Sequence, residues 1–394
     1  MKFKGYREYC TNCGLCASVD GVGFSKDDNG NEWPELSEKN SKLCSSVCPA
    51  SGNALRNYQD GTIWGTYKRA MLGWSNDENI RFGAATGGVL TGLCIYLLEN
   101  HIVDGVIQTR RSAKDIRKTE TIVSRSKTDV LSCMGSRYTV SSPLREITSL
   151  IQEGETYAFV GKPCDVSSLR IYIKEFKPQW GDRIKYMLTF FCGGQPSMQA
   201  NNKLIKYLGC KNLSDCYRLD YRGNGWPGQT TLTLKNGDVK TLDYETTWMK
   251  ILGRGVRLVC RFCADGTGEL ADVACGDAWY LNSKDYPDFI ERQGRNIIFS
   301  RTEAGDNLLK AIEKSAQIFF QEIDVEKDKV RKMQPYHYTR KASLIEYKYA
   351  LKVCGRAFPN YDNKILRGFA KDFPVKQKIL RFGGTIQRVI KGFI

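Results

Sequence analysis

The chain has 394 residues, of which 41% are hydrophobic and 26% charged. It is therefore long enough for one large core with small additions at its ends, and too apolar for a disordered protein. Its net charge is +16, but residues 340–394 hold thirteen Lys and Arg against three Asp and Glu, so most of the charge belongs to a tail and does not indicate a nucleic-acid-binding protein.

No segment has the roughly eighteen unbroken apolar residues of a membrane-spanning helix. The residues after Met1 lack the apolar stretch of a secretory signal, which predicts a cytoplasmic protein. In that reducing compartment, clustered cysteines are more often metal ligands or redox groups than disulfides. Because fifteen cysteines accompany only two histidines, all-thiolate sites are favoured over mixed Cys/His zinc or Rieske sites.

Residues 1–60 contain a compact cysteine motif and are predicted to fold around a metal. Three cysteines form a C-x2-C-x2-C run, and a Cys-Pro pair follows about thirty residues later: Cys10, Cys13, Cys16 and Cys48. This arrangement resembles a bacterial ferredoxin motif that holds a 4Fe–4S cluster. No Cys-Pro follows closely after Cys16, so only one cluster is expected here. Cys48 is the expected fourth ligand and Cys44 the alternative, and a zinc knuckle is the alternative metal site.

Residues 61–330 alternate between predicted strands and helices, which indicates an α/β (α+β) core with a mixed sheet. The predicted strands are Val103–Gln108, Tyr157–Val160, Tyr186–Phe191 and Asn296–Ser300, and the helices are Val89–Leu98, Val166–Ile173 and Glu303–Ser315. Thr230–Leu234 and Val239–Leu242 flank an Asn-Gly pair, which predicts a hairpin.

Four cysteines of this core are candidates for a second metal site. Cys164 and Cys192 each follow a predicted strand, and Cys260 and Cys263 form a C-x2-C pair. Ligands collect beyond the carboxyl ends of strands in open α/β sheets, so these thiols can converge there. A zinc site, or two free thiols plus a thioredoxin-like redox pair, is the alternative from spacing alone.

Several motifs occur in an order that resembles the coenzyme F420 hydrogenase/dehydrogenase beta-subunit family. They are Gly87-Gly88, Gly135-Ser136-Arg137-Tyr138, Gly161-Lys162-Pro163-Cys164, Phe191-Cys192-Gly193-Gly194, Cys260-Arg261-Phe262-Cys263, and Ala271 to Asp277. The resemblance covers roughly residues 5–310, and the ferredoxin-like extension is similar to that of plant hydroxymethyl-chlorophyll reductase. The resemblance to the beta-subunit family implies a non-covalent FAD beside a 4Fe–4S cluster. The ligands of that cluster map onto Cys164, Cys192, Cys260 and Cys263.

The same resemblance directs attention to residues that could hold the flavin. Glycines at a helix start offer backbone N–H groups to phosphate, and nearby side chains add hydroxyl, cationic and aromatic groups. The candidates are Thr86, Gly87, Gly88, Ser136, Arg137, Tyr138, Lys162 and Asp277. Taken singly, each of these residues also has a structural explanation that involves no flavin. In that explanation the glycines allow close packing, the arginine forms a surface ion pair, the tyrosine packs in the core, and the aspartate belongs to a turn.

The segment from Gly223 to Gly228 satisfies G-x-G-x-x-G literally. A dinucleotide fingerprint must follow a strand and open a helix, whereas this motif contains Pro227 and precedes the predicted hairpin. We therefore reject a Rossmann site and expect an irregular loop that lines the flavin or substrate pocket through Asn224 and Trp226.

Residues 331–394 are predicted to form a basic, helical tail. Apolar residues recur at three- and four-residue steps among lysines and arginines: Ile379, Phe382, Ile386, Ile390 and Phe393. Such a helix suits the anionic inner face of a membrane, and docking on the body or on a partner is the alternative. Bacterial members that resemble this chain are associated with surface-polysaccharide synthesis, which adds a lipid-linked sugar to the candidate substrates.

These patterns predict an iron–sulfur flavoprotein oxidoreductase. Electrons from a ferredoxin, another low-potential donor or a deazaflavin are expected to pass through two 4Fe–4S clusters to FAD and an organic substrate. The first alternative is an electron-transfer subunit of a larger complex without its own substrate chemistry. The second is a zinc-binding adaptor that is not an enzyme. No catalytic acid is predicted.

Overall fold

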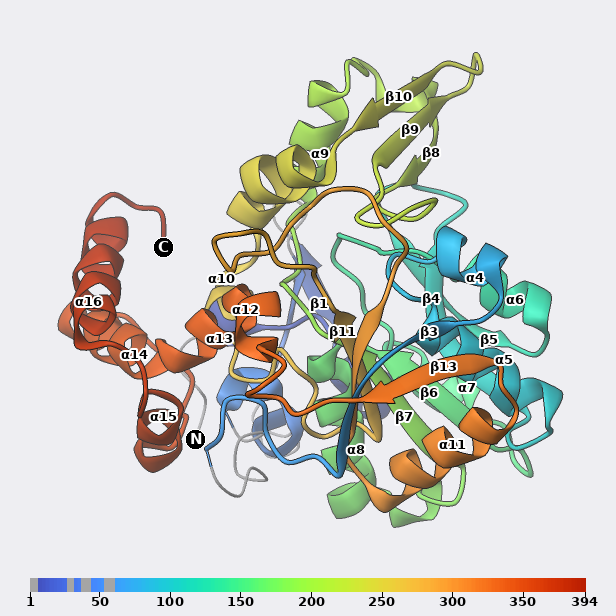
Figure 1. The fold of residues 1–394 in the computed structure, drawn as a ribbon. Helices are drawn as coiled ribbons and strands as arrows, with labels where there is room; N and C mark the ends of the chain where they lie inside the picture. The colour runs from blue at the N-terminus through green and yellow to red at the C-terminus, as the bar shows by residue number, and fades with distance from the viewer. Residues whose placement is uncertain (1–5, 27–31, 37–43, 53–60) are drawn as a thin grey trace.

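The computed structural model describes residues 6–26, 32–36, 44–52 and 61–394. Its centre is an eight-stranded sheet in the order β13-β3-β12-β11-β7-β6-β4-β5. The four neighbours β11, β7, β6 and β4 run parallel, and the flanking pairs are antiparallel. The strands are β3 (Arg69–Ser75), β4 (Gly105–Arg111), β5 (Thr119–Ser124), β6 (Tyr157–Gly161), β7 (Ile184–Phe190), β11 (Val273–Asp277), β12 (Asn296–Ser300) and β13 (Ile318–Glu322). The predicted mixed α/β class is confirmed (Figure 1).

Helices cover both faces of this sheet because adjacent strand residues point to opposite sides. Val106, Ala158 and Leu188 pack with α5 (Val89–Glu99) and α11 (Glu303–Lys314) on one face. Their neighbours Ile107, Phe159 and Met187 pack with α8 (Pro163–Phe176) on the other. Shorter helices complete the core: α4 (Glu78–Gly83), α6 (Lys127–Ser132), α7 (Ile147–Leu150) and α10 (Leu258–Arg261).

A small sheet stands beside the core. It consists of β8 (Cys216–Asp220) with the expected hairpin β9 (Thr230–Leu234) and β10 (Val239–Leu242), which pair antiparallel. Helix α9 (Met198–Tyr207) and a π-helix over Thr246–Leu252 cover it and share its apolar cluster. Figure 1 shows this unit at the top of the molecule.

The cysteine-rich amino-terminal segment packs between the core and the carboxy-terminal helices. It holds α1 (Tyr6–Tyr9), α2 (Leu15–Asp20), and the two-stranded sheet of β1 (Phe24–Lys26) and β2 (Glu32–Pro34). Leu15 and Val47 enter the apolar cluster of α8. Tyr9 and Ala50 join a cluster that contains Leu344 and Leu366.

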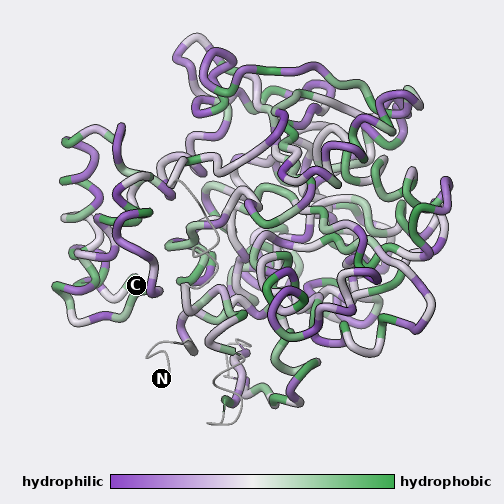
Figure 2. The backbone as a smooth tube through the Cα atoms, turned by 90° about the horizontal axis from the view of Figure 1, so that it is seen from below, coloured by the Kyte–Doolittle hydropathy of each residue, from purple (hydrophilic) through white to green (hydrophobic). Residues whose placement is uncertain are grey.

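Five helices end the chain: α12 (Val330–Met333), α13 (Pro335–Ala342), α14 (Leu344–Val353), α15 (Asn363–Phe369) and α16 (Val375–Ile390). The predicted helical tail is thus present, but α13 is buried in the body whereas α16 lies at the edge of the molecule (Figures 1 and 2). Within the described residues, no helix has both the length and the hydropathy to cross a bilayer.

Candidate functional site

Several of the predicted site residues gather at one edge of the parallel sheet. Lys162 and Cys164 follow β6, Cys192 follows β7, and Asp277 ends β11. Because these strands are parallel neighbours, their carboxyl ends share one edge, where open α/β sheets bind ligands. The expected helix after β6 starts earlier than predicted, at Pro163, since proline suits the first helical position. Cys164 therefore lies in the first turn of α8.

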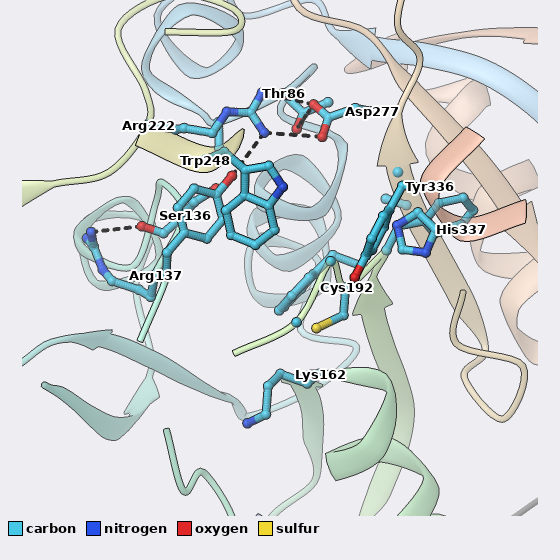
Figure 3. Close-up of a pocket in the computed structure, with 18 of the residues that line it drawn as sticks. Thr86, Ser136, Arg137, Lys162, Cys192, Arg222, Trp248, Asp277, Tyr336 and His337 are labelled. Atoms are coloured by element: carbon cyan, nitrogen blue, oxygen red, sulfur yellow. Dashed lines mark hydrogen bonds and ion pairs between the residues drawn. The ribbon is translucent and has the colours of Figure 1, made fainter. Parts of the chain in front are cut away.

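A cavity of about 750 Å³ opens at this edge. Its wall contains seven of the nine residues predicted to bind flavin, namely Thr86, Gly88, Ser136, Arg137, Tyr138, Lys162 and Asp277. Figure 3 shows Arg222, Trp248, Tyr336 and His337 around the same space. A pocket of this size with aromatic walls and a few fixed polar groups is suited to a cofactor.

Asp277 is held by a dense set of donors at the cavity wall. Its carboxylate accepts from both terminal nitrogens of Arg222, at 3.1 and 2.9 Å. Trp226 Nε1 donates to it at 2.8 Å, and the Thr86 hydroxyl at 3.1 Å. The Arg222 side chain is 3% exposed and that of Asp277 is 21% exposed. This buried bidentate pair fixes the start of the Thr86 loop against the end of β11.

Aromatic rings form much of the wall around this pair. Trp279 stacks on Trp226 with ring centroids 4.7 Å apart, and the Arg222 guanidinium lies 4.8 Å from the centre of Tyr244. The ring centroids of Tyr138 and Trp248 lie 4.7 Å apart, and the Tyr138 hydroxyl accepts from Arg222 at 3.4 Å. Such flat apolar faces beside a cation and a carboxylate suit a planar, partly polar ring system.

Two predicted flavin residues and one expected lining residue are placed outside the cavity wall. A side chain at Gly87 would meet Asn296 Oδ1 at 2.7 Å, so this glycine allows close packing of the helix start. Asn224 is exposed, in left-handed backbone, and does not line the cavity. Trp226 lies behind the wall and holds Asp277 instead of facing the cavity.

The two predicted cations differ in how they are satisfied. Lys162 Nζ lies 2.7 Å from Asp165 and donates to the Ser141 hydroxyl at 2.9 Å. Burial by itself lowers the pKa of Lys162, but Asp165 and the nearby thiols outweigh it, so that the pKa is raised and the amine stays charged. Arg137 donates to the Ser136 and Met134 carbonyls, and its buried Nε has no described partner. Arg137 also lies 3.8 Å from Asp220, so its buried Nε is the atom of this guanidinium that is left to receive a ligand.

The four core cysteines come together below the cavity floor. Burial is the largest cause of the raised pKa of Cys164, and the charges of Asp165, Cys192 and Cys263 raise this pKa further. Burial likewise raises the pKa of Cys192 to about 11, with Cys260 adding to the effect. The Gln195 backbone N–H donates to Cys260 Sγ at 3.2 Å. Each of these thiols interacts by charge with at least two others, and Cys192, Cys260 and Cys263 accept backbone N–H groups, which fits the ligand set of a cubane.

Arg340 is a buried cation beside these thiols that the sequence analysis missed. Its guanidinium donates to the Cys192 carbonyl at 3.0 Å and to the Cys260 carbonyl at 3.4 Å. It also contacts His337 Nδ1 at 3.2 Å, which must accept because arginine only donates. Within the described chain Arg340 has no carboxylate partner, and its positive charge lowers the pKa values of nearby thiols. It therefore favours thiolates in this quartet.

The amino-terminal cysteines also come together. Burial raises the pKa of Cys48 well above its usual value, and the charges of Cys13, Cys10 and Cys16 add to this. The Asn12 backbone N–H donates to Cys10 Sγ at 3.4 Å. A hydrogen bond with Cys44 is the largest cause of the raised pKa of Cys16. Cys48 is thus close to all three cysteines of the run, whereas Cys44 stands beside Cys16.

This placement separates the two candidates for the fourth amino-terminal ligand. We expect Cys48→Ala to remove about four irons per chain, because Cys48 lies within charge reach of the other three ligands. Cys44→Ala is expected to keep them. The iron and acid-labile sulfide content of each variant, measured after anaerobic purification, checks both expectations. Loss of iron in Cys44→Ala with retention in Cys48→Ala would assign the role to Cys44 instead.

The two quartets are linked through a few direct contacts. Gln195 donates its side-chain amide to the Thr11 carbonyl at 2.8 Å, while its backbone N–H reaches Cys260. The Ser168 hydroxyl, one helical turn after Cys164, donates to Cys13 Sγ at 3.7 Å. The order in space is therefore amino-terminal quartet, second quartet, cavity.

Single-ion sites and cubanes hold their thiolates at different separations. Thiolates of a zinc site lie about 2.3 Å from one ion and hence close to one another. Among the described residues, no three His, Cys, Asp or Glu side chains form a group that could hold a single metal ion. A cubane spreads its thiolates over four irons and holds them farther apart.

Three arginines, one from α10 and two from α16, line the end of the cavity near the carboxy terminus: Arg261, Arg381 and Arg388. Burial lowers the pKa of Arg261, and Arg388 lowers it further by repulsion. Arg381 Nε is buried without a described partner. None of the three has an ion pair within the part of the chain that the structure describes. This end of the cavity therefore favours an anionic group.

Comparison with known proteins connects this site to a family. The model described as "Coenzyme F420 hydrogenase/dehydrogenase, beta subunit N-term" matches residues 70–148, and its C-terminus counterpart matches residues 154–326. Together they cover more than half of the chain, including Asp277 and the second cysteine quartet. The amino-terminal cysteines and Arg340 lie outside both matches.

Curated relatives and a solved structure agree with these matches. The coenzyme F420 hydrogenase subunit beta of Methanococcus voltae is 27% identical over 66% of this chain and 86% of its own. The 7-hydroxymethyl chlorophyll a reductase of Oryza sativa subsp. japonica is 22% identical over 78% and 62%. A chain of the F420-reducing NiFe hydrogenase complex of Methanosarcina barkeri shares the fold, with a TM-score of 0.57 and 18% identity over 76% of this chain and 97% of that one.

Proposed function

The chain belongs to the coenzyme F420 hydrogenase/dehydrogenase beta-subunit family of oxidoreductases, and from that premise we propose that it passes electrons through two 4Fe–4S clusters to an FAD in the cavity. The observation that carries this proposal is the spatial order of the two cysteine quartets and the cavity. Cys10, Cys13, Cys16 and Cys48 would hold the first cluster, and Cys164, Cys192, Cys260 and Cys263 the second. The proposal divides the chain into residues 1–60, 61–330 and 331–394.

In this proposal FAD, when bound, supplies the exchange between one-electron carriers and a two-electron substrate. The chain's own residues bind and orient it. Gly88 and Ser136 offer backbone and hydroxyl groups, and Arg137 offers a buried guanidinium with an unused nitrogen. The Arg222–Asp277 pair fixes one wall. Lys162 keeps a positive charge between the cavity and the second quartet. This charge favours the negative charge that an added electron brings to the flavin or to the second cluster.

The arginines at the far end of the cavity indicate the class of the reacting partner. Arg261, Arg381 and Arg388 favour a donor or substrate that carries phosphate or carboxylate groups. A deazaflavin with an acidic tail and a lipid-linked sugar phosphate both meet this condition. A ferredoxin would instead dock on the surface near the amino-terminal quartet. A role in surface-polysaccharide synthesis stays a prediction.

Anaerobic purification with iron, sulfide and flavin quantified tests the cofactor content. About eight irons and one FAD per chain are expected. A preparation that contains zinc in place of iron and no flavin would instead support the alternative of a zinc-binding adaptor that is not an enzyme. Adding reduced coenzyme F420 or reduced ferredoxin to the purified chain, with flavin absorbance followed under argon, then identifies the donor.

A second candidate function is that of an electron-transfer subunit in a larger complex. The name of the Methanococcus voltae relative, a hydrogenase subunit, favours it, whereas the rice relative is named as a reductase. Turnover of a small substrate by the isolated chain would support the first candidate. Flavin reduction without turnover, restored by co-purifying proteins, would support the second.

Arg340 is expected to tune the second cluster. Its buried positive charge favours the added electron, so Arg340→Gln should lower the reduction potential of that cluster by tens of millivolts. The first cluster should be unchanged, because the cysteines that Arg340 affects belong to the second quartet. Redox titration followed by electron paramagnetic resonance resolves the two signals. Arg340→Lys, which keeps the charge, should recover most of the shift, and a shift in the first cluster would contradict this assignment.

A further inference from the structure

Helix α16 leaves part of its apolar side exposed to solvent, while Val389 packs against the body. Val375, Ile379 and Ile390 are 70%, 67% and 78% exposed, and Phe393, just beyond the helix end, is 67% exposed. The opposite side faces the body, where Thr385 is fully buried and Arg381 and Arg388 line the cavity. We call Val375, Ile379, Ile390 and Phe393 the outer stripe.

This orientation is the reverse of that expected for a surface helix. Such a helix normally buries its apolar stripe and exposes its charges. Single exposed apolar residues are common, but a row of them along one helix indicates an interaction surface. The stripe is aligned because positions 375, 379 and 390 differ by about one or four whole turns. Figures 1 and 2 both show α16 at the edge of the molecule, where a large surface can approach it.

The charge around the stripe indicates what that surface is. Lys376 and Lys391 are exposed near the two ends of α16, so that their ammonium groups can extend beside the ends of the outer stripe. The segment from residue 340 to the end holds thirteen basic against three acidic residues. An apolar stripe bordered by lysines is typical of helices that lie in the headgroup region of an anionic bilayer.

We propose that α16 docks on an anionic membrane surface through the outer stripe. Val375, Ile379 and Ile390 enter the headgroup region, and the lysines pair with lipid phosphates. The helix lies parallel to the surface and does not cross it. Docking of this kind is independent of the chemistry in the cavity, so a failure of the proposed electron transfer leaves it intact.

Flotation of the full chain with lipid vesicles tests this proposal. Wild-type protein is expected to float with phosphatidylcholine vesicles that contain about half phosphatidylglycerol, and not with phosphatidylcholine alone. The double variant Ile379→Glu with Ile390→Glu is expected to lose binding by at least about tenfold. The matched control carries Tyr217→Glu and Val239→Glu, two exposed apolar positions on the small sheet, and should bind as wild type does.

A second pair of substitutions keeps the test independent of the glutamate variant's folding. Lys376→Gln with Lys391→Gln leaves the stripe intact and should weaken binding to anionic vesicles while reducing its dependence on salt. Equal binding by wild type and the glutamate variant would overturn the proposal. So would an absence of vesicle binding, or a stripe-dependent dimer in light scattering, which would make the stripe a protein interface.

Discussion

Cys260→Ala is expected to lose about four of eight irons per chain and to slow flavin reduction by an amino-terminal electron donor by more than about a hundredfold. Cys260 is buried, and its sulfur accepts the Gln195 backbone N–H. Without this ligand one iron of the second cluster has no thiolate, and the electron path from the first quartet to the cavity is interrupted. Alanine is chosen because serine can replace cysteine as a ligand.

Two measurements check this result. Iron and sulfide analysis should show half of the wild-type content, and stopped-flow spectroscopy should show the first cluster reduced while the flavin stays oxidised. Cys354→Ala is the control, since Cys354 lies at the end of α14 and contacts neither quartet in the described chain. Full iron content and fast flavin reduction in Cys260→Ala would remove Cys260 from the ligand set.

Asp277→Asn is expected to lower the free energy of unfolding by about 3–5 kcal/mol, the range for breaking a buried ion pair. Arg222 is almost fully buried and has Asp277 as its carboxylate partner. Asparagine keeps an acceptor for Trp226 and Thr86, but it removes the charge and turns an amide toward the guanidinium. The wall of the cavity loosens, and flavin retention should fall with stability.

Urea unfolding followed by tryptophan fluorescence measures this change. Asp285→Asn is the control, because Asp285 also contacts two cations, Lys329 and Lys332, but at the exposed surface. Exposed ion pairs contribute little to stability, so this variant should unfold at the wild-type urea concentration. Equal midpoints for both variants would show that the Arg222–Asp277 pair is not a structural element of the wall.

Local features of the site could be predicted from the sequence. The spacing of Cys10, Cys13 and Cys16 determines a tight turn by itself, and the Asn-Gly pair determines the hairpin. Buried strands and helices such as Asn296–Ser300 and Val89–Leu98 were found because their apolar runs are continuous. Strands β3, β5 and β13 were missed, since their mixed residues become strands only through pairing with neighbours.

Groups that act across long sequence separations were decided by the tertiary structure. Arg222 and Arg340 were not predicted as site residues, because nothing near them in the chain shows that Asp277 and the second quartet are their neighbours. The loop of Asn224 and Trp226 was predicted to line the cavity, but Asn224 is exposed and Trp226 lies behind the wall on Asp277.

The sequence by itself determined the class of the protein: an α/β oxidoreductase fold, a ferredoxin-like cysteine run and a basic amphipathic helix near the end. Only the tertiary structure decided where these parts lie. It brought the two quartets and the cavity next to one another, and it left Val375, Ile379 and Ile390 of α16 exposed. The physical reason is that spacing and periodicity encode contacts within a few residues, whereas contacts between distant segments depend on strand order and on how the whole core packs.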